Sequence, residues 1–367
     1  MFRPMRFMKQ MILFALLVLL GPNAPAKEAP FFVCGSDGIY RGELDADTGK
    51  LGPLSLACKT SQANFLALSP DGKSLYATTS NSVRSFAVGA DGTLTPLNEI
   101  AEPGSEACHV SVDAAGRDVL VAEYNTGYVD CFSRKPDGML GERTSFHMLE
   151  GSGPDKARQM GSHAHSIYID PANKFVYVCD LGGDDVWIYK FDAAQGKLKA
   201  NTPLLAKVPP GSGPRHLVFD ASGRFVYVAS EMGHCVTRFS RDAASGALTP
   251  LETVSTLPSE MPAAGVATAE IAIHPSGRWL YVSNRGCDTI SEFSIGADGQ
   301  LTLVDSVSSV AKFPRNFALD PSGRWLIVAG QKDNRLAVLK IDPANGRLTA
   351  TDQFTGMAAP NCVLFVP

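Results

Sequence analysis

The sequence lacks several signatures that would assign its chemistry at once. It contains no G-x-S-x-G nucleophile elbow, no Walker phosphate loop, and no G-x-G-x-x-G between a strand and a helix. It also lacks a charge excess, because 33 Lys and Arg stand against 37 Asp and Glu. These absences argue against serine-hydrolase, nucleotide-hydrolase and dinucleotide-binding classes. They also argue against a nucleic-acid partner, which would need a basic surface.

Long hydrophobic runs are scarce as well. The run from Met11 to Leu20 covers about ten residues, which is too short to cross a bilayer. Cations precede it and Ala24-Pro25-Ala26 follows it, which is the pattern of a secretory signal peptide. No lipobox-type Cys follows the run. We therefore expect residues 1–26 to be removed, leaving an exported chain, periplasmic or secreted, without a membrane attachment. A retained N-terminal anchor shares this pattern and is the alternative.

Glycine and proline are plentiful, with 34 and 24 copies, and they separate short strands within a repeat. Each copy reads as an alternating strand, a turn such as D-P-S-G-R, a second apolar strand, and then two further strands. The copies recur every 45 to 56 residues, which is the period of propeller blades. The six copies begin at Asn64, His109, His165, His216, Glu270 and Asn316.

The two chain ends supply one more blade between them. NCVLFVP at the C-terminus matches the first strand of the repeat, and the segment from Phe31 matches the other three. The sequence therefore predicts an all-β, seven-bladed propeller of four antiparallel strands per blade, as one domain over residues 30–367. Sharing a blade closes the ring and protects its sheet edges, so we expect a monomer.

The eight cysteines provide a test of that closure. Aligning the shared blade with the other repeats places Cys34 opposite Cys362 on neighbouring strands. Opposed Cβ atoms in a sheet are near the separation that a disulfide accepts. We therefore predict a Cys34–Cys362 disulfide, or otherwise two small buried side chains, and expect the other six cysteines to be buried thiols.

Polar side chains occur where the repeats meet the ends of the channel. In the stretch GPRHLVFDASGRFVYVASE, Arg215 precedes the first strand and Glu231 follows the second, so antiparallel pairing brings them together. Convergent polar groups in a concave site predict a ligand pocket. The matching positions that we expect to bind substrate are His163, Asp180, Glu270, Asn284, Arg315, Asn316 and Gln331.

Several motifs in order resemble the seven-bladed lactonase family, which includes propeller-type 6-phosphogluconolactonases and carboxymuconate-cyclizing enzymes. They are HAHSIYIDPANKFVYVCDLGGDDV from His163, GPRH at 213–216, AEI at 269–271, SNRG at 283–286 and PRNFALDPSGRWL at 314–326. The resemblance covers nearly the whole mature chain. It implies hydrolysis or formation of a lactone in the central cleft, with no cofactor and no obligatory metal. It places the catalytic set on His165, Arg215, Glu231 and Arg285.

The chain also departs from the family pattern. Relatives commonly have DLG-x-D-R where this chain has Asp184-Asp185, and an Asn-Glu pair where it has Ser230-Glu231. The missing cation, like the predicted export, fits poorly with a cytosolic phosphorylated substrate. We therefore expect another lactone or anionic sugar acid as substrate.

Lactone opening needs a general base and a stabilised oxyanion. Either His165 or Glu231 can be the base, while Arg215 and Arg285 can hold the oxyanion and an anionic group of the substrate.

Alternative interpretations remain at this point. Arg215 and Glu231 can form a purely structural ion pair, and His163 with His165 can face one way as metal ligands do. His109 and His216 are expected to be structural hydrogen-bonding groups, as is Asp180. The whole propeller can also be a non-catalytic binding platform, since fold does not imply chemistry.

Overall fold

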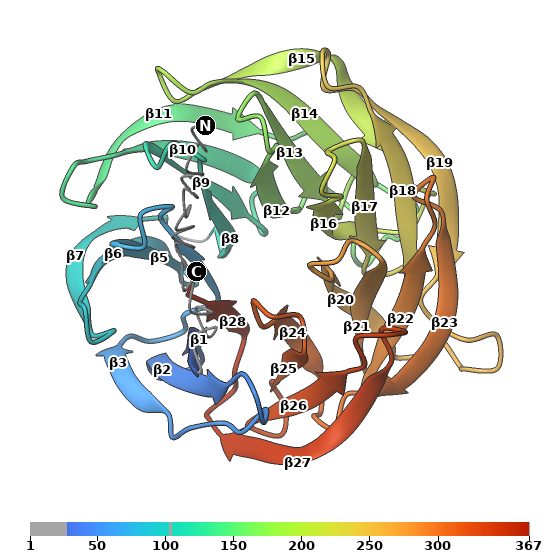
Figure 1. The fold of residues 1–367 in the computed structure, drawn as a ribbon. Helices are drawn as coiled ribbons and strands as arrows, with labels where there is room; N and C mark the ends of the chain where they lie inside the picture. The colour runs from blue at the N-terminus through green and yellow to red at the C-terminus, as the bar shows by residue number, and fades with distance from the viewer. Residues whose placement is uncertain (1–27, 103–104, 367) are drawn as a thin grey trace, which may run out of the picture.

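The chain folds into a ring of seven four-stranded antiparallel blades around a central axis (Figure 1). The structure, a computed structural model, describes residues 28–102 and 105–366, and the described residues contain no helix. None therefore offers a helical segment long and apolar enough to cross a membrane. The ring confirms the predicted fold. The predicted signal peptide, residues 1–26, lies outside the described residues.

Each blade runs from an inner strand at the channel to an outer strand at the rim. The inner strands are β4 (Phe65–Leu68), β8 (Ala107–Val112), β12 (Ala164–Ile169), β16 (Pro214–Phe219), β20 (Ala267–Ile273), β24 (Pro314–Leu319) and β28 (Cys362–Phe365). The second strands are β1 (Glu28–Cys34), β5 (Ser74–Thr78), β9 (Asp118–Glu123), β13 (Phe175–Asp180), β17 (Phe225–Ser230), β21 (Trp279–Arg285) and β25 (Trp325–Gly330). The third strands are β2 (Gly38–Asp45), β6 (Ser82–Val88), β10 (Tyr128–Arg134), β14 (Asp185–Asp192), β18 (Cys235–Arg241), β22 (Thr289–Ile295) and β26 (Arg335–Ile341). The outer strands are β3 (Ser55–Lys59), β7 (Leu94–Ala101), β11 (Leu140–Met148), β15 (Lys197–Lys207), β19 (Leu248–Ser255), β23 (Leu301–Ser308) and β27 (Leu348–Gly356).

The two chain ends close the ring as the sequence predicts. The inner strand β28 pairs antiparallel with β1, and Cys362 lies directly opposite Cys34. Figure 1 shows the dark red β28 beside the blue β1. Because the first blade takes strands from both ends, its hydrogen bonds hold the termini together and leave no open edge between blades.

The apolar core lies between neighbouring blades, and buried aromatic residues repeat within it. A buried Tyr on the second strand donates its hydroxyl proton to a carbonyl in the outer turn of the next blade. The pairs are Tyr76 to Gly138 (2.8 Å), Tyr177 to Gly246 (2.8 Å), Tyr227 to Gly299 (2.8 Å) and Tyr281 to Gly346 (2.6 Å). Trp325 Nε1 donates in the corresponding way to the carbonyl of Ala46, which lies in the blade that the termini share (2.9 Å).

The turn glycines in these contacts allow close packing. Gly246 has a φ of +74°, and a Cβ there would lie 2.4 Å from the Phe175 ring. Any other residue at this position would therefore strain the backbone and push the neighbouring blade away.

Five inner strands contain a β-bulge near their first residue, where the register against the second strand shifts. In four of them a single extra residue is left without a paired partner: Cys108, His165, Arg215 and Arg315. In β20 the shift spans Ala269 and Glu270. A bulge turns a side chain away from its regular direction and is common beside active sites.

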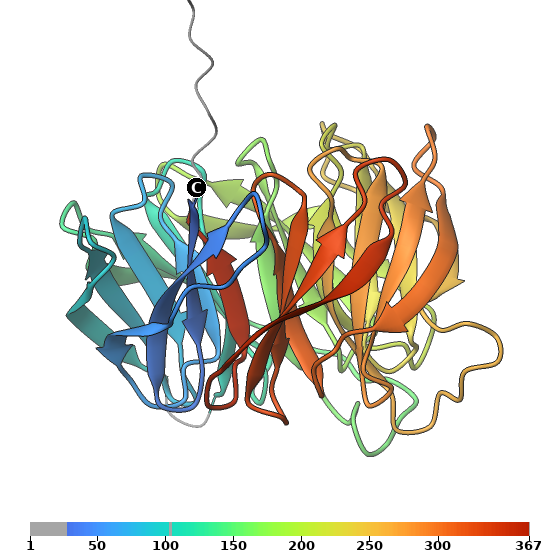
Figure 2. The same cartoon turned by 60° about the horizontal axis from the view of Figure 1, so that its bottom comes forward.

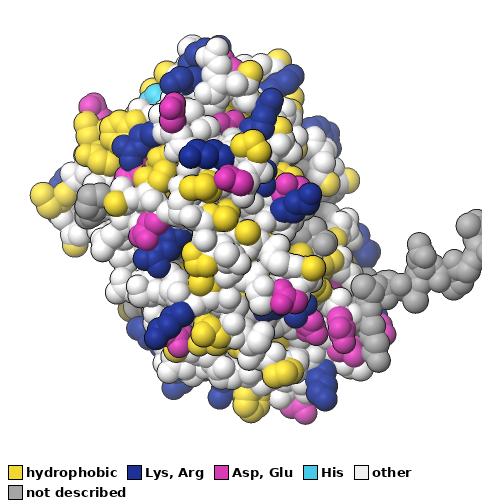
Figure 3. Space-filling view, turned by 90° about the vertical axis from the view of Figure 1, so that its left-hand side faces the viewer, with side chains coloured by type: hydrophobic (Ala, Val, Ile, Leu, Met, Phe, Trp, Pro, Cys, Tyr) yellow, Lys and Arg dark blue, Asp and Glu magenta, His cyan; other side chains and the backbone are white. Residues whose placement is uncertain are grey.

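The bulges lie at the end of the channel where the longest loops enter. Figure 2 shows the loops before β12 (residues 149–163, green) and before β20 (residues 256–266, orange) projecting from the side opposite the C-terminus. On the side of the ring seen in Figure 3, Lys and Arg are interspersed with Asp and Glu, as the small net charge predicts.

Candidate active site

The bulged side chains line two adjoining spaces at the loop-bearing end of the channel. The first, here called the outer cavity, has a volume of about 190 Å³ and is lined by Glu106, Cys108, Tyr124, Arg158, His165, Glu231, Arg285 and Arg315. The second, the inner void, measures about 10 Å³ and is lined by Asn64, Phe65, Cys108, His165, Arg215, His216, Glu270, Arg315, Asn316 and Asn361. The two spaces share Cys108, His165 and Arg315, all of them bulge residues.

Glu231, directly after β17, is the point on which three cations converge. Its carboxylate lies 2.6 Å from Arg285 Nη2, 2.9 Å from Arg158 Nη2 and 3.2 Å from Arg215 Nε. Burial alone would raise the pKa of this carboxyl, but the three guanidinium groups lower it to about 2. Glu231 is therefore a permanent anion that positions the arginines, and it is a weak base at neutral pH.

His165 is the bulge residue of β12 and lines both spaces. It is 5% exposed, and its Nδ1 has no hydrogen-bond partner among the described residues. Burial, and then the charges of Arg215 and neighbouring cations, lower the pKa of His165 well below its usual value. The ring is therefore neutral at pH 7 and has a free lone pair to offer.

Arg315 is the bulge residue of β24 and also lines both spaces. It makes no ion pair or hydrogen bond with any part of the chain that the structure describes. Burial and the nearby Arg285 lower the pKa of its guanidinium. A half-buried guanidinium without a partner is suited to receive an anion or a developing oxyanion.

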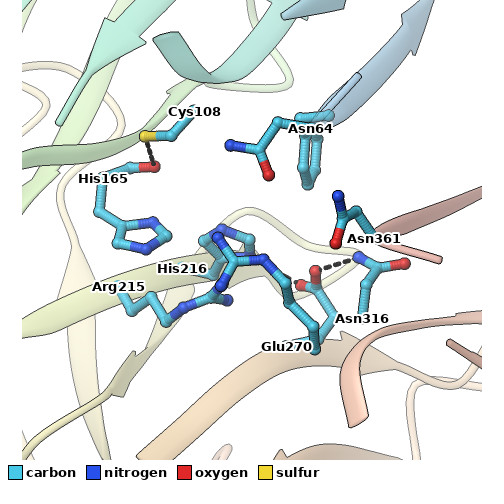
Figure 4. Close-up of a pocket in the computed structure, with 10 residues that line it drawn as sticks. Asn64, Cys108, His165, Arg215, His216, Glu270, Asn316 and Asn361 are labelled. Carbon is cyan, nitrogen blue, oxygen red and sulfur yellow. Dashed lines mark hydrogen bonds and ion pairs between the residues drawn. The ribbon is translucent and has the colours of Figure 1, made fainter. Parts of the chain in front are cut away.

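The floor of the inner void is formed by a hydrogen-bonded group. His216 Nδ1 lies 3.0 Å from Glu270 Oε1, and Asn316 Nδ2 donates to Glu270 Oε2 at 2.5 Å. Figure 4 shows these three side chains with His165 and Arg215 around a common space. Burial lowers the pKa of His216 although Glu270 opposes it, so the ring is held neutral beside an ionised carboxylate.

The outer cavity therefore presents an excess of guanidinium groups around one neutral imidazole. Arg158, Arg285 and Arg315 line the cavity together with the carboxylates of Glu106 and Glu231. Arg215 does not line it but binds Glu231, so it is a fourth cation close to the cavity. Such a site can bind an anionic ligand and stabilise an oxyanion while His165 accepts a proton.

Comparison with known proteins agrees with this chemistry. The family model described as Lactonase, 7-bladed beta-propeller matches residues 32–365. The chain belongs to the seven-bladed β-propeller lactonase family. The 6-phosphogluconolactonase of Bacillus subtilis is 31% identical over 338 residues, covering 90% of this chain and 95% of that protein. The 6-phosphogluconolactonase of Klebsiella pneumoniae is 32% identical over 319 residues, covering 85% and 91%.

Solved structures give the same result. The periplasmic gluconolactonase PpgL of Pseudomonas aeruginosa superposes with a TM-score of 0.87 at 29% identity, covering 93% of this chain and 99% of that one. This lactonase therefore shares both its fold and its overall sequence pattern with hydrolases of lactones.

The structure brings together all four residues that the resemblance assigned to catalysis in this lactonase. His165, Glu231 and Arg285 line the outer cavity, while Arg215 lies beneath it, bound to Glu231 and facing the inner void. The Arg215–Glu231 contact is a buried ion pair, as the structural interpretation expected, and it also belongs to the cavity wall. Of the predicted substrate-binding residues, Glu270, Arg315 and Asn316 line the inner void.

Four other predicted substrate-binding residues line neither space, because hydrogen bonds within the fold engage them. Asp180 accepts the backbone N–H groups of His163, Gly182 and Gly183. The remaining three have these contacts: His163 stacks on Tyr124 and reaches its carbonyl through Nδ1 (2.8 Å), Asn284 bonds to Thr256, Thr268 and Ser291, and Gln331 donates to Asn361 (2.6 Å).

His163 and His165 do not belong to a group of three potential metal ligands among the described residues, and a backbone carbonyl engages His163 Nδ1. Among residues 28–102 and 105–366, one group of three potential ligands lies close enough to hold a metal: Glu102, Glu123 and Asp130. Arg143 already binds two of them, so a guanidinium occupies the place of a cation.

Sequence reasoning missed Arg158, Tyr124, Glu106 and Cys108, which all line the outer cavity. Tyr124 directly follows β9, the same place in its blade that Glu231 has after β17, so the repeat carried a signal for it. Cys108 carried a signal too, because it immediately precedes His109 at the start of a repeat. Arg158 lies in the loop before β12, where no repeat position marks it.

The predicted cysteine pairing has a mixed outcome. The register that places Cys34 opposite Cys362 is confirmed, and both residues are buried. Both are free thiols in the structure, as are the other six cysteines, so the disulfide itself stays a prediction.

Proposed function

We propose that this lactonase is exported and hydrolyses the lactone of a sugar acid or a related carboxylic acid in the outer cavity. The observation that carries the proposal is Arg315, a cavity-lining guanidinium that makes no hydrogen bond or ion pair with the described residues. It lies near Arg285, which shares Glu231 with Arg158 and Arg215. A small ligand with a carboxylate, a phosphate or a strongly polarised carbonyl would supply the partner that Arg315 lacks.

In the proposed reaction, a water in the outer cavity attacks the lactone carbonyl carbon and loses a proton to His165. The carbonyl oxygen becomes an oxyanion, which Arg315 and Arg285 stabilise. Collapse of the tetrahedral intermediate breaks the bond to the ring oxygen, and the protonated His165 returns its proton to that oxygen. No metal is required, because the guanidinium groups provide the positive charge.

The electrostatics favour His165 over Glu231 as the base. Three arginines bind Glu231 and lower its pKa to about 2, so it has little affinity for a proton at neutral pH. The pKa of His165 is also lowered, first by burial and then by cations. A bound anionic substrate would neutralise part of that positive charge and so raise the affinity of His165 for a proton during the reaction.

The names of the relatives indicate two candidate substrates. Those from Bacillus subtilis and Klebsiella pneumoniae are 6-phosphogluconolactonases, whereas the structural relative from Pseudomonas aeruginosa is a periplasmic gluconolactonase. The predicted signal peptide favours the second kind, because a phosphorylated sugar lactone of the cytosol would not reach an exported enzyme. We therefore propose an unphosphorylated sugar-acid lactone as the first candidate.

The test is hydrolysis of 6-phosphogluconolactone, gluconolactone and muconolactone by purified mature protein with a chelator present. Arg285→Ala should lower kcat/KM for the active substrate by about 10²- to 10³-fold, because it removes an oxyanion donor. Arg324→Ala is the matched control, since Arg324 lies on an exposed turn and pairs with Asp47. A folded wild type that accelerates none of the three would contradict the proposal and favour a binding platform. Conversion of muconolactone to its open-chain acid, or of that acid to muconolactone, would instead place this protein with the carboxymuconate-cyclizing enzymes of the family.

A further inference from the structure

Three buried polar atoms of different residues, all without hydrogen-bond partners, belong to side chains that line the inner void. They are His165 Nδ1, His216 Nε2 and Arg215 Nη1. The three side chains are 5%, 2% and 2% exposed, so bulk water does not reach them freely. A void of about 10 Å³ is close to the space that one water molecule needs, and a buried water is stable where two to four polar groups surround it.

The relation between the two histidines suits a bridging water. Their ring centroids lie 5.3 Å apart with the ring planes at 70°, and no direct hydrogen bond joins them. One water that bonds to both rings spans a separation of this size. Figure 4 shows both rings, with Arg215 beside them, at the edge of the same space.

The contacts of His216 fix which of its nitrogens carries the proton. Glu270 is an acceptor at 3.0 Å from Nδ1, so the neutral ring donates from Nδ1 and presents Nε2 as an acceptor. Glu270 is itself held by Asn316 Nδ2 and by the backbone N–H of Ile271 (3.0 Å). The direction of the hydrogen bonds is therefore set from Glu270 outward.

We propose that one ordered water in the inner void connects His216 to His165, and that His216, backed by Glu270, is a positioning residue for lactone hydrolysis. The water donates to His216 Nε2, accepts from Arg215 Nη1 and accepts from His165 Nδ1–H. His165 is thereby held in the tautomer whose Nε2 is unprotonated and available as the base. When His165 accepts a proton, its positive charge is stabilised through the water by the His216–Glu270 pair. This inference rests on the proposed function, in which His165 is the base.

The charged and titratable groups around His216 are known, so its substitution can be interpreted. They come from five inner strands and are Glu270, Arg215, Arg315, His165, His109 and Tyr168. His109 provides a matched control, because its ring is buried and lies 5.4 Å from that of His216, yet it lines neither the outer cavity nor the inner void.

The experiment compares His216→Asn, Glu270→Gln and His109→Asn with the wild type, using the lactone that the wild type hydrolyses. Asn at position 216 keeps a donor toward Glu270 and removes Nε2. We expect His216→Asn to lower kcat by about 10- to 100-fold with KM changed by no more than about threefold, as loss of an outer-shell partner does elsewhere. The acidic limb of its kcat–pH profile should also move, while His109→Asn should stay within about twofold of the wild type at every pH.

A folded His216→Asn variant with wild-type kcat and an unchanged pH profile would overturn the inference. If that variant does not fold, Glu270→Gln is judged by the same criteria. A high-resolution crystal structure of the wild type gives a readout that does not depend on activity, and an inner void without a water near His216 Nε2 would also overturn the inference. If the wild type hydrolyses no lactone, the proposed function fails instead, whatever the crystal structure shows in the inner void.

Discussion

Replacing Glu231 by Gln removes the carboxylate on which Arg158, Arg215 and Arg285 converge. In the folded protein the pKa of Glu231 is about 2, against 4.5 for an unperturbed glutamate. Burial raises the pKa, but the arginines outweigh it, so folding favours the ionised form by about 2.5 pKa units. Each unit corresponds to about 1.4 kcal/mol, so the ionised carboxylate contributes about 3 kcal/mol to stability at pH 7.

The sign of the pH dependence follows from the lowered pKa. The folded protein binds the proton less readily than the unfolded chain, so the contribution is complete above about pH 5 and falls as the pH approaches 2. At pH 3.5 about 2 kcal/mol of it should remain. Glu231→Gln should therefore lower the free energy of unfolding by about 3 kcal/mol at pH 7 and by about 1 kcal/mol less at pH 3.5.

Urea denaturation followed by tryptophan fluorescence at both pH values measures this difference. Glu260→Gln is the control, because Glu260 is exposed and, within the described part of the chain, bonds only to the neighbouring Ser259. A difference between wild type and Glu231→Gln that is the same at pH 7 and pH 3.5 would refute the electrostatic reasoning. It would show that Glu231 stabilises the fold by shape and neutral hydrogen bonds instead.

Two further predictions concern groups away from the cavity. Burial and then the neighbouring Glu123 raise the pKa of Asp130 to about 9 despite Arg143, so its contribution to stability is present at low pH and declines as the pH rises toward 9. Asp130→Asn, which imitates the protonated acid, should gain stability relative to the wild type between pH 5 and pH 8; equal urea midpoint differences at both values would contradict this. Protein exported by the cell should begin near Lys27 and contain a Cys34–Cys362 disulfide, whose reduction should cost about 2–5 kcal/mol of stability. Non-reducing mass spectrometry checks both the new N-terminus and the bond, and two alkylated thiols at these positions would exclude the disulfide.

The fold could be predicted from the sequence because its determinants are local and repeated. Each blade has its own alternating strands and turn glycines. A strand register that is wrong by one residue in one blade therefore does not change the assignment of the next blade. The closure of the ring could be predicted in the same way. NCVLFVP has the pattern of an inner strand but no second strand follows it, and the segment from Phe31 has the pattern of the second, third and fourth strands without an inner strand. Pairing them is the single arrangement that leaves neither with an open edge.

The site was predictable only in part, because its geometry depends on bulges that strand periodicity does not reveal. A pattern with period two assigns alternate residues to opposite faces, and by that rule His163 and His165 point the same way. The bulge after Ala164 breaks the alternation, so His165 faces the cavity while His163 packs on Tyr124. The same displacement aims Arg215 and Arg315 inward. Asp180, Asn284 and Gln331 were expected in the pocket because they are polar at strand ends, but nearby donors and acceptors engage each of them.

The position of Arg158 depends on Asp184, the neighbour of the departure at position 185. The resemblance expects a cation at position 185, where this chain has a carboxylate that pairs with Lys207 at 2.6 Å and lines neither the outer cavity nor the inner void. Asp184, which the family pattern retains, accepts the backbone N–H of Gly213 and the side-chain amide of Gln159, both at 2.8 Å. These bonds fasten the loop before β12 to the entrance of β16, and the residue before Gln159 is Arg158, 2.9 Å from Glu231. Arg158 therefore reaches Glu231 from a loop that Asp184 helps to hold in place. Because that loop belongs to no repeat, a change in it can alter the charge of the outer cavity while the seven blades stay the same.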